Sequence, residues 1–437
     1  MLKGKTVAPL TLGCKVNQYE TDGMIELLKE AGMTAVSFEE KADVYLINTC
    51  SVTNMADKKS RQMIHRAKKL NPDAVVIAAG CYVQAAKDKL MEDDRISIII
   101  GNNKKKDIVQ ILEDYLEIGV TDEGMLDIAA EKEYEPLTIN STLEHTRAYV
   151  KIQDGCNQFC SYCIIPYVRG RIRSRELASI TEEVERLAQT GVKEIVLTGI
   201  HISSYGKDKE NEVGLADAID AISKIESIER IRLGSLEPGI ITDTFIDRIV
   251  DNKKVCPHFH LSLQSGCNTV LKRMNRKYTC EEYFEKCEML REAFDRPALT
   301  TDVIVGFPGE TDEEFQETVD YLTKLNLYEM HIFKFSPRQG TVAAGMRDQI
   351  GPEIKNQRSD VLLALSEKNK HAYEASFRGE TLEVLIEEKV RRNGKDGYRG
   401  HTERYIDIFV EEECMHRICG REVDIINHIV QIPYGME

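Results

Sequence analysis

Short apolar runs alternate with amphipathic stretches through residues 1–127 of the chain. The runs VAPLTL, DVYLIN, AVVIAA and ISIII are typical of buried strands. The stretches between them, at residues 19–31, 55–70, 84–93 and 106–118, have the pattern of amphipathic helices. This strand–helix alternation predicts a small α/β domain built on a parallel sheet.

The same alternation resumes after an acidic, irregular segment at residues 121–144, which we interpret as a linker. Further strands are predicted at RAYVKIQ, EIVLTG, RIRLGS, FHLSLQ, TDVIVGF and MHIFKFS, with helical stretches such as TEEVERLAQTG between them. Six strand–helix units in about 190 residues predict a curved parallel sheet or partial barrel. A long helix predicted at residues 353–376 ends this second domain, which spans residues 145–376.

The pattern changes again in the tail, at residues 377–437. The segments TLEVLIEEKV, GYRGHT, RYIDIFV and REVDIINHIVQI are separated by turn-like pieces, which predicts a small all-β barrel. The predicted fold class is therefore α/β, with an N-terminal parallel-sheet domain, a central partial (β/α)6 barrel and a C-terminal β module.

The sequence features below predict a cytosolic protein. No apolar run approaches the roughly 18 residues that span a bilayer, so we expect no membrane segment. The start, MLKGKTVAPLTLGC, has too short an apolar stretch for a signal peptide. Because the cytosol keeps thiols reduced, the 12 cysteines predict buried thiols and metal ligands instead of disulfides. The net charge of −15 disfavours nonspecific nucleic-acid binding, so an RNA partner requires locally gathered basic residues.

Cys156, Cys160 and Cys163 form a C-x3-C-x2-C array directly after the predicted strand YVKIQ. The carboxyl ends of parallel strands are where such sheets place their chemistry. Zinc and most iron–sulfur clusters bind four protein ligands, so this array leaves one position open. A zinc site would need a fourth ligand, and the nearest histidines, His145 and His201, lack a paired spacing.

With the aromatic Tyr162 before its last cysteine, this array resembles that of the radical S-adenosylmethionine enzymes. In these enzymes three thiolates hold a 4Fe–4S cluster, and S-adenosylmethionine binds the open iron. The reduced cluster then cleaves the sulfonium to a 5′-deoxyadenosyl radical. The resemblance implies the same cofactors here.

A second set of three cysteines is spread over the N-terminal domain. Cys14, Cys50 and Cys81 each come just past a predicted strand, in TLGC, NTC and AAGC. If the strands are parallel, the three thiols lie along one sheet edge and converge. Small residues precede them and allow backbone to approach a bulky group: Gly13, Thr49 and Gly80. Three buried thiols are the alternative, but the equivalent positions favour a second 4Fe–4S cluster with one open iron.

The other six cysteines show no ligand-like grouping, and we interpret them as structural. Cys280 and Cys287 share a helical face. Cys414 and Cys419 are a possible pair in the terminal module. The full set is Cys256, Cys267, Cys280, Cys287, Cys414 and Cys419.

Longer stretches carry a closer resemblance. TLGCKVNQYETDGM, NTCSVT, AAGCYVQ, DGCNQFCSYCIIPYVRGRIRSR, GSLEP, HLSLQSGCNTVLKRMNRKYT and TDVIVGFPGET resemble the methylthiotransferase family of radical S-adenosylmethionine enzymes. The resemblance covers nearly the whole chain, and the tail resembles the small RNA-binding barrel called TRAM. CKVNQYET is most similar to the branch that acts on N6-threonylcarbamoyladenosine in tRNA. At the same place, the isopentenyladenosine branch has a sequence more similar to GCQMNVYD, and the ribosomal-protein branch has one more similar to GCPKN.

This resemblance implies a tRNA-modifying reaction beside the anticodon, at position 37. One S-adenosylmethionine molecule methylates a sulfide on the second cluster, and another supplies the radical that attacks C2 of the adenine. The implied partners are a tRNA anticodon stem-loop and an electron donor such as flavodoxin or ferredoxin. The alternatives are an isopentenyladenosine tRNA substrate, a ribosomal-protein substrate, and a non-catalytic iron–sulfur protein that binds RNA or senses redox state.

The resemblance implies that several residues at strand ends contact S-adenosylmethionine. These candidates are Tyr162, Gly199, Ser235, Glu237 and Gln264, and the alternative for each polar residue is an ordinary satisfied hydrogen bond.

Basic residues in three places are candidate RNA contacts, with a solvated or salt-bridged face as the alternative. An arginine run follows the first cysteine array, at Arg169, Arg171, Arg173 and Arg175. A second group is Lys272, Arg273, Arg276 and Lys277, and a third is Lys104, Lys105 and Lys106. The terminal module has nine Lys/Arg against thirteen Asp/Glu, so its basic face must be concentrated. The candidates there are Lys389, Arg391, Arg392, Lys395 and Arg399.

Overall fold

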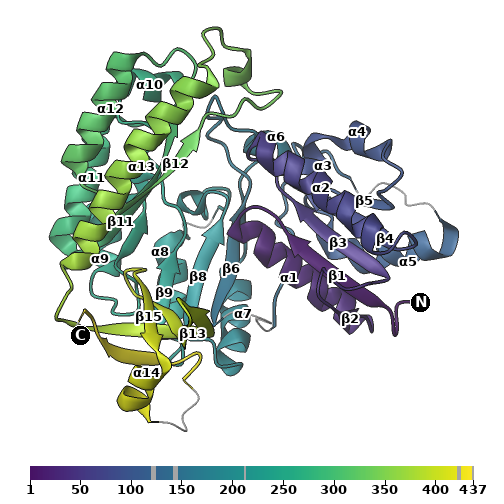
Figure 1. Cartoon of the computed structure of the whole chain (residues 1–437). Helices are drawn as coiled ribbons and strands as arrows, with labels where there is room; N and C mark the ends of the chain where they lie inside the picture. The colour runs from purple at the N-terminus through teal and green to yellow at the C-terminus, as the bar shows by residue number, and fades with distance from the viewer. Residues whose placement is uncertain (120–124, 141–145, 211–212, 421–424, 436–437) are drawn as a thin grey trace.

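The computed structural model describes residues 1–119, 125–140, 146–210, 213–420 and 425–435. A parallel sheet with its helices lies beside a larger, strongly curved sheet, and a small β module lies below the latter (Figure 1). Within the described residues, no helix combines the length and apolarity that crossing a membrane requires.

The N-terminal sheet is parallel throughout, as predicted, with the strand order β2-β1-β3-β4-β5. Its strands are β1 (Thr6–Thr11), β2 (Thr34–Ala35), β3 (Val44–Thr49), β4 (Val75–Gly80) and β5 (Ile98–Ile100). Its helices are α1 (Lys15–Glu30), α2 (Asn54–Leu70), α3 (Cys81–Ala85), α4 (Lys87–Met91) and α5 (Ile108–Ile118), the last preceded by the 3-10 turn η1 (Lys105–Asp107). The single helix predicted at residues 84–93 is wrong, because Ala86 leaves the helical conformation and separates α3 from α4.

The central domain contains the six predicted parallel strands as two arcs of a partial barrel. One arc is β6 (Arg147–Asp154), β8 (Glu194–Gly199) and β9 (Arg230–Leu233), and the other is β10 (His258–His260), β11 (Ala298–Val305) and β12 (Glu329–Lys334). Isolated parallel bridges, including Leu236 to Leu261, join the arcs. A short antiparallel strand, β7 (Arg173–Ser174), pairs with the free edge of β6.

Helices cover the outer face of this barrel (Figure 1). They are α7 (Leu177–Gln189), α8 (Leu215–Ser223), α9 (Asp243–Ile249), α10 (Asn268–Arg273), α11 (Cys280–Ala293), α12 (Asp312–Leu325) and α13 (Pro352–Ala375), with 3-10 turns η2 (Ile202–Ser204), η3 (Pro238–Ile240) and η4 (Val342–Gly345). The short helix α6 (Ile165–Arg169) packs instead against α3 of the N-terminal domain. Thr279 and Thr311 start α11 and α12 with capping boxes, each accepting from the backbone N–H of a glutamate three residues later.

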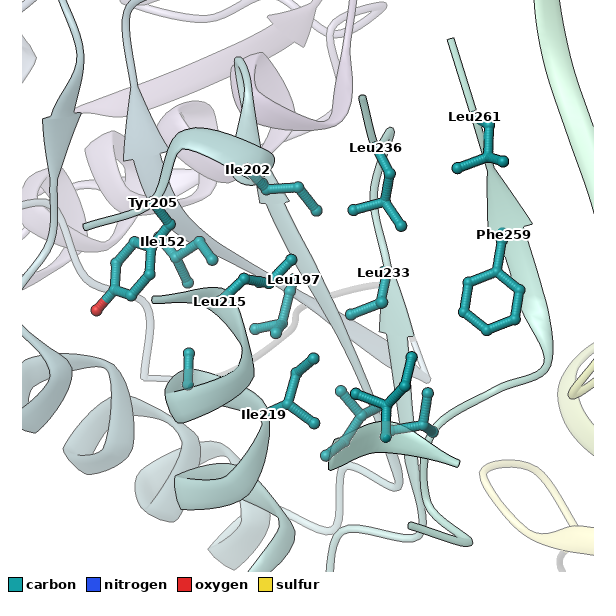
Figure 2. Close-up of a cluster of buried hydrophobic side chains, with 14 of the residues drawn as sticks. Ile152, Leu197, Ile202, Tyr205, Leu215, Ile219, Leu233, Leu236, Phe259 and Leu261 are labelled. Atoms are coloured by element: carbon teal, nitrogen blue, oxygen red, sulfur yellow. The ribbon is translucent and has the colours of Figure 1, made fainter. Parts of the chain in front are cut away.

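The largest core lies between the barrel strands and these helices (Figure 2). Leu197 and Leu233 project from neighbouring strands toward Leu215 and Ile219 of α8. Each of these side chains is almost fully buried, and burial of one such side chain stabilises a fold by roughly 1.5–3 kcal/mol. This core holds the strand ends in fixed positions, which is what a site at those ends needs.

The terminal module is an antiparallel sheet with the order β15-β14-β13-β16. Its strands are β13 (Thr381–Arg392), β14 (Lys395–Thr402), β15 (Asp407–Glu411) and β16 (Ile429–Pro433). A helix that the sequence did not predict, α14 (Glu412–Cys419), packs on it. Residues 421–424 of the predicted segment REVDIINHIVQI lie outside the described residues. Arg147 and Arg230, at the first residues of β6 and β9, contact Glu387 and the Glu383 carbonyl, so the module lies at the amino ends of these strands.

The predicted linker packs against both larger domains where it is described. Residues 125–140 form no helix or strand, yet Leu137 and Ile139 are buried in the main core. The carbonyl of Leu137 accepts a hydrogen bond from the Tyr19 hydroxyl of α1 at 2.6 Å. Residues 121–124 and 141–144 lie outside the described residues, and the domain boundaries stay predictions.

Candidate active site

The first cysteine set, the barrel triad (Cys156, Cys160 and Cys163), lies on the loop that follows β6. Backbone hydrogen bonds shape this loop: Cys156 N–H donates to Gly170 O at 3.0 Å, and Cys163 N–H to Cys160 O at 2.9 Å. Burial, together with the neighbouring thiols of Cys160 and Cys156, raises the pKa of Cys163 to about 12. The three thiols therefore lie together.

A buried arginine approaches this triad from the end of α10. Arg276 Nη1 donates to the sulfur of Cys160 at 3.2 Å, and its Nη2 pairs with Glu237 Oε1 at 2.7 Å. Glu237 Oε2 lies 3.3 Å from Nε2 of His201. Arg276 is only 5% exposed as a side chain, so its predicted role as an RNA contact is wrong. Its charge instead faces a cysteine sulfur.

The second set, the sheet-edge triad (Cys14, Cys50 and Cys81), comes from the carboxyl ends of β1, β3 and β4. Burial raises the pKa of Cys50 to about 11, and the neighbouring thiols of Cys81 and Cys14 contribute to that rise. The backbone of residue 13 lies so close to Cys50 that a glycine is required there: a Cβ on Gly13 would lie 2.9 Å from the sulfur of Cys50. Gly13 also has a φ of +105°, which L side chains rarely adopt.

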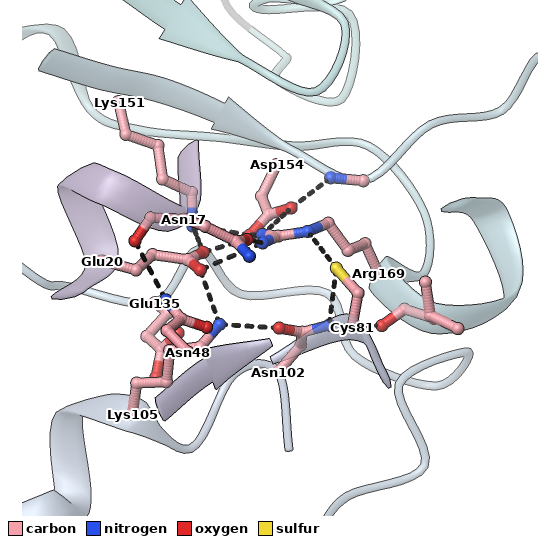
Figure 3. Close-up of polar contacts among 12 residues, drawn as sticks. Asn17, Glu20, Asn48, Cys81, Asn102, Lys105, Glu135, Lys151, Asp154 and Arg169 are labelled. Atoms are coloured by element: carbon pink, nitrogen blue, oxygen red, sulfur yellow. Dashed lines mark hydrogen bonds and ion pairs between the residues drawn. The ribbon is translucent and has the colours of Figure 1, made fainter. Parts of the chain in front are cut away.

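Arg169 joins this triad to the barrel (Figure 3). Its Nε donates to the sulfur of Cys81 at 3.2 Å, and its Nη1 pairs with Glu20 of α1 at 2.7 Å and with Asp154 of β6 at 3.1 Å. Its Nη2 donates to Oδ1 of Asn17 at 2.7 Å. Because Asp154 lies two residues before Cys156, one guanidinium ties both cysteine triads to a common frame.

Two lysines complete this buried charge network, which consists of Glu20, Lys105, Lys151, Asp154 and Arg169 (Figure 3). Lys105 and Lys151 pair with the two carboxylate oxygens of Glu20 at 2.6 and 2.7 Å. Burial opposes ionisation of Glu20, but Arg169, Lys105 and Lys151 together hold its pKa well below the usual range. Buried ions are tolerated when they are paired and hydrogen-bonded in this way.

The arginine run that we predicted to bind RNA phosphates is mostly internal. Arg169 and Arg173 have no exposed surface, and Arg175 is 3% exposed. Arg173 donates to the carbonyls of residues 169 and 171, and Arg175 pairs with Glu183. The prediction is therefore wrong for these three side chains. Arg171 is exposed and stacks over the Phe159 ring at 4.4 Å.

The other predicted RNA contacts differ in exposure. Lys272 and Lys277 are exposed, whereas Arg273 pairs with Glu314 at 2.6 Å. Of the lysines at 104–106, Lys105 is buried against Glu20. All five basic candidates of the terminal module contact carboxylates: Lys389 to Glu412, Arg391 to Asp396, Arg392 to Asp407, Lys395 to Glu411 and Arg399 to Asp407. Acidic neighbours thus offset the positive charge of the face that was expected to bind RNA.

A basic helix that was not among the predicted RNA contacts lies beside the site. Helix α2 carries six Lys or Arg side chains against a single Asp, and Lys58, Lys59 and Lys69 are exposed. It begins at Asn54, directly after the loop that follows Cys50. Counting charge over each predicted helix, instead of over short runs, would have revealed it.

A cavity of about 220 Å³ lies between the two triads, and we call it the reaction cavity. Val52 and Thr53 of the Cys50 loop line one side, and Tyr162 and Cys163 of the barrel triad line another. Residues from the carboxyl ends of the barrel strands complete the wall: Gln264, Asp302, Ile304, Phe333 and Ser336. One cysteine of the barrel triad and the loop that follows Cys50 of the sheet-edge triad therefore border the same space.

The predicted S-adenosylmethionine contacts lie around this space at different distances from it. Tyr162 and Gln264 line the reaction cavity, and Glu237 holds Arg276 against Cys160. Ser235 lines a neighbouring cavity inside the barrel. Gly199 ends β8, where a Cβ would meet the Gln153 carbonyl at 2.9 Å. These placements leave the individual contacts as predictions.

The donor sets fit two iron–sulfur clusters. All six thiols are free, each triad is a set of neighbouring sulfurs, and Gly13 keeps side-chain atoms away from Cys50. Each triad also has one buried guanidinium donating to a sulfur, at Cys81 and at Cys160. Hydrogen bonds of this kind stabilise thiolate ligands and tune cluster potentials.

Two family models match the chain. Residues 150–322 match the Radical SAM superfamily, and residues 6–101 match a family described as Uncharacterized protein family UPF0004. The first match contains the barrel triad and the second contains the sheet-edge triad.

Full-length relatives carry names of tRNA-modifying enzymes. The chain is 42% identical over 430 residues to threonylcarbamoyladenosine tRNA methylthiotransferase MtaB of Bacillus subtilis, covering 98% of this chain and 93% of that protein. It is 41% identical to the protein of the same name from Aquifex aeolicus, covering 92% of this chain and 96% of that one. A tRNA-2-methylthio-N(6)-dimethylallyladenosine synthase of Thermoanaerobacter pseudethanolicus is 36% identical, with 94% and 89% covered.

Among solved structures, the radical S-adenosylmethionine methyltransferase TsrM of Kitasatospora setae, with cobalamin and a [4Fe-4S] cluster bound, has a similar fold. The TM-score is 0.57 at 15% identity, with 78% of this chain and 77% of that chain covered. At this identity the likeness concerns the fold alone.

Proposed function

We propose a function from the premise that this chain belongs to the radical S-adenosylmethionine tRNA methylthiotransferase family. The enzyme replaces the C2 hydrogen of N6-threonylcarbamoyladenosine with a methylthio group, at position 37 of tRNA. The relatives from Bacillus subtilis and Aquifex aeolicus, at 42% and 41% identity, are named for this nucleoside, whereas the dimethylallyladenosine enzyme is 36% identical. As in its family, the cofactors are S-adenosylmethionine and 4Fe–4S clusters.

The observation that carries this proposal is a cavity that borders both Cys163 of the barrel triad and the loop that follows Cys50 of the sheet-edge triad. A reaction that joins a sulfur-containing group to an unactivated aromatic carbon needs a radical source and a sulfur source within reach of the same atom. The reaction cavity borders Cys163 of the barrel triad and the Val52–Thr53 loop next to Cys50 of the sheet-edge triad.

The residues of the chain then take separate tasks. Cys156, Cys160 and Cys163 would hold the cluster that binds S-adenosylmethionine, and Cys14, Cys50 and Cys81 would hold the sulfur-bearing cluster. When bound, the two clusters supply the electron that cleaves S-adenosylmethionine and the sulfur that is transferred. Arg276 and Arg169 donate hydrogen bonds to one sulfur in each triad. Tyr162 and Phe333 line the cavity and limit the access of water to a radical reaction there.

The tRNA anticodon stem-loop meets the protein beside the reaction cavity. Lys58 and Lys59, near the start of α2, offer exposed charge next to the Cys50 loop, and Lys69 extends it to the far end of that helix. Arg171 offers charge next to the barrel triad. Phosphate contacts supply much of the affinity and set its salt dependence. Since the chain carries a net charge of −15, binding depends on these local groups.

An electron donor such as flavodoxin or ferredoxin reduces the first cluster. Either reduced protein, added anaerobically in place of a chemical reductant, is expected to support 5′-deoxyadenosine formation by the reconstituted enzyme.

Nucleoside mass spectrometry tests the function directly. A strain lacking this chain should lose the methylthio form of threonylcarbamoyladenosine and accumulate the unmethylthiolated nucleoside. Re-expression of the chain should restore the product, and re-expression of a Cys50→Ala variant should not. Loss of the methylthio form of isopentenyladenosine instead would assign the chain to the other tRNA branch.

A further inference from the structure

The interior of the barrel contains a polar cavity next to the reaction cavity. This lumen cavity has a volume of about 230 Å³, and Asp302 lines both spaces. Its other polar lining residues include Lys15, Ser235, His258, His260, His331 and Tyr405. Interiors of small parallel barrels are normally filled by branched apolar side chains, so this polarity requires a reason.

Sheet register explains why these side chains meet. Thr300 and Asp302 lie two residues apart on β11 and therefore share one face. Asp302 pairs in register with His331 of β12, and Thr300 pairs with His260 of β10. The inward positions of three adjacent strands are thus polar.

Lys15 enters this cavity from the other domain. It is the first residue of α1 and directly follows Cys14 of the sheet-edge triad. Within the described part of the chain, no carboxylate lies within ion-pair distance of its ammonium group, and its closest recorded partner is the Tyr149 ring at 5.9 Å. Lys15 is an exposed residue that also lines the lumen cavity. An anion in the cavity would give its ammonium group a charge-assisted hydrogen bond.

The acidic groups of the cavity already have partners. Asp302 Oδ1 lies 3.5 Å from Nε2 of His260, and Glu329 Oε1 lies 2.9 Å from the ammonium of Lys370. By contrast, Nδ1 of His258, a residue 9% exposed, has no hydrogen-bond partner. A buried polar atom of this kind usually has a partner, so the lining offers a cation and a ring nitrogen to a ligand.

We propose that the lumen cavity binds the N6 substituent of the target adenosine and that Lys15 pairs with the carboxylate of its threonine part. This inference rests on the proposed function. Ring positions 2 and 6 of adenine are meta to each other, so a base with C2 in the reaction cavity directs its N6 group elsewhere. The lumen cavity shares the lining residue Asp302 with the reaction cavity and is therefore a neighbouring space for that group.

The chemistry of the substituent matches the lining. A threonylcarbamoyl group has a carboxylate for Lys15, and a hydroxyl and a urea that hydrogen-bond to groups such as His258. An isopentenyl group has none of these. A cavity that offers an unpaired cation to an anionic substituent selects it over adenosine without one.

Binding of anticodon stem-loop RNA to the holoenzyme tests the inference. One stem-loop carries threonylcarbamoyladenosine at position 37, and a second carries adenosine. The wild type should prefer the first, and Lys15→Gln should reduce that preference by about 10- to 100-fold, as expected for a lost charge-assisted hydrogen bond. Lys29→Gln, at the opposite end of the same helix, serves as the control and should keep the wild-type preference.

A third stem-loop, with the threonine carboxylate converted to a methyl ester, sharpens the test. The ester should weaken wild-type binding as much as Lys15→Gln does, and it should have little further effect on Lys15→Gln, because both changes remove one interaction. The measurements include a chelator, since ligand atoms of His260, Asp302 and His331 lie within 4.8 Å of one another and a metal ion there would fill the same space. Iron content and melting temperature check that each variant is folded.

An unchanged preference in Lys15→Gln, additive effects of ester and variant, or a wild type without preference would each overturn the inference. None of these results bears on the reaction itself, which nucleoside mass spectrometry decides. If the deletion strain shows that another nucleoside is the substrate, the proposed function fails independently of Lys15.

Discussion

The barrel triad occupies one loop between Cys156 and Cys163, whereas the sheet-edge triad gathers Cys14, Cys50 and Cys81 from the ends of three strands. The loop is shaped by hydrogen bonds within itself and to Gly170, and Ser161 also bonds to the backbone of Met274 and Ala343. The sheet-edge set depends on the parallel register of β1, β3 and β4. The cysteines of the first set are neighbours in sequence, whereas those of the second meet only when the domain is folded.

Both triads have an arginine bound to one sulfur, and the partners of these two arginines differ. A buried arginine donates to one sulfur in each, at 3.2 Å in both cases. Arg276 has one carboxylate partner, Glu237. Arg169 lies among Glu20, Asp154 and two lysines that span the domain interface. Arg169 thus couples the sheet-edge triad directly to domain packing through Cys81, whereas the barrel triad meets this network only through Asp154, two residues before Cys156.

The largest expected effect is on the barrel triad. Cys160→Ala should lose the first cluster and all cleavage of S-adenosylmethionine, because only two protein ligands remain. Iron content and 5′-deoxyadenosine yield, measured anaerobically after reconstitution, check this. Cys280→Ala, a buried thiol at the start of α11, should keep both values. Retained cleavage in Cys160→Ala would refute the assignment.

Removing a cysteine of the sheet-edge triad should abolish product formation but leave cleavage of S-adenosylmethionine intact. Cys50→Ala should retain roughly half the iron and still cleave S-adenosylmethionine, because one of two clusters remains. It should form no methylthio nucleoside. The three quantities should be measured on one sample, together with folded protein. Full iron content with normal product would show that Cys50 is a buried structural thiol.

The interface network should contribute more to stability than surface pairs do. Arg169→Gln leaves Glu20 and Asp154 buried with less compensation, so the free energy of unfolding should fall by about 3–5 kcal/mol. Arg248→Gln, which breaks exposed pairs with Asp217 and Asp220, should change it by about 0–1 kcal/mol. Urea unfolding measures both. Equal losses in the two variants would contradict a special role for the network.

The smallest expected effect concerns RNA binding beside the sheet-edge triad. Replacing Lys58 and Lys59 with alanine should reduce the slope of log binding constant against log salt by about 1.5, since two fewer phosphates are neutralised. Replacing Lys389 and Lys395, which are already paired with Glu412 and Glu411, should leave the slope nearly unchanged. The reverse result would place the RNA on the terminal module instead of on α2.

Periodicity predicted most of the fold because strands and helices follow local patterns. All ten strands expected in the two larger domains are present, and the parallel N-terminal sheet is confirmed. The errors occur where local signals compete. Residues 84–93 form two short helices, and the tail contains α14 beside its strands.

The arginine run shows where local patterns stop being informative. Arg169 ends α6, Gly170 turns the chain, and Arg173 begins the two-residue β7, so equal spacing in sequence does not place these side chains on one face. Arg171 alone of the four is exposed. Burial depends on what packs over a residue, and for Arg169 that is α1, far away in sequence.

By itself, the sequence determined both cysteine triads, because ligand spacing on a loop and cysteines at equivalent strand ends are encoded by neighbouring residues. The tertiary structure alone decided which cations face sulfur, RNA or a ligand. Arg169 meets Glu20 and Cys81, and Lys15 faces His258 and Tyr405, only after domains distant in sequence have packed. Charge is a property of one residue, but its partner and its exposure are properties of the folded chain.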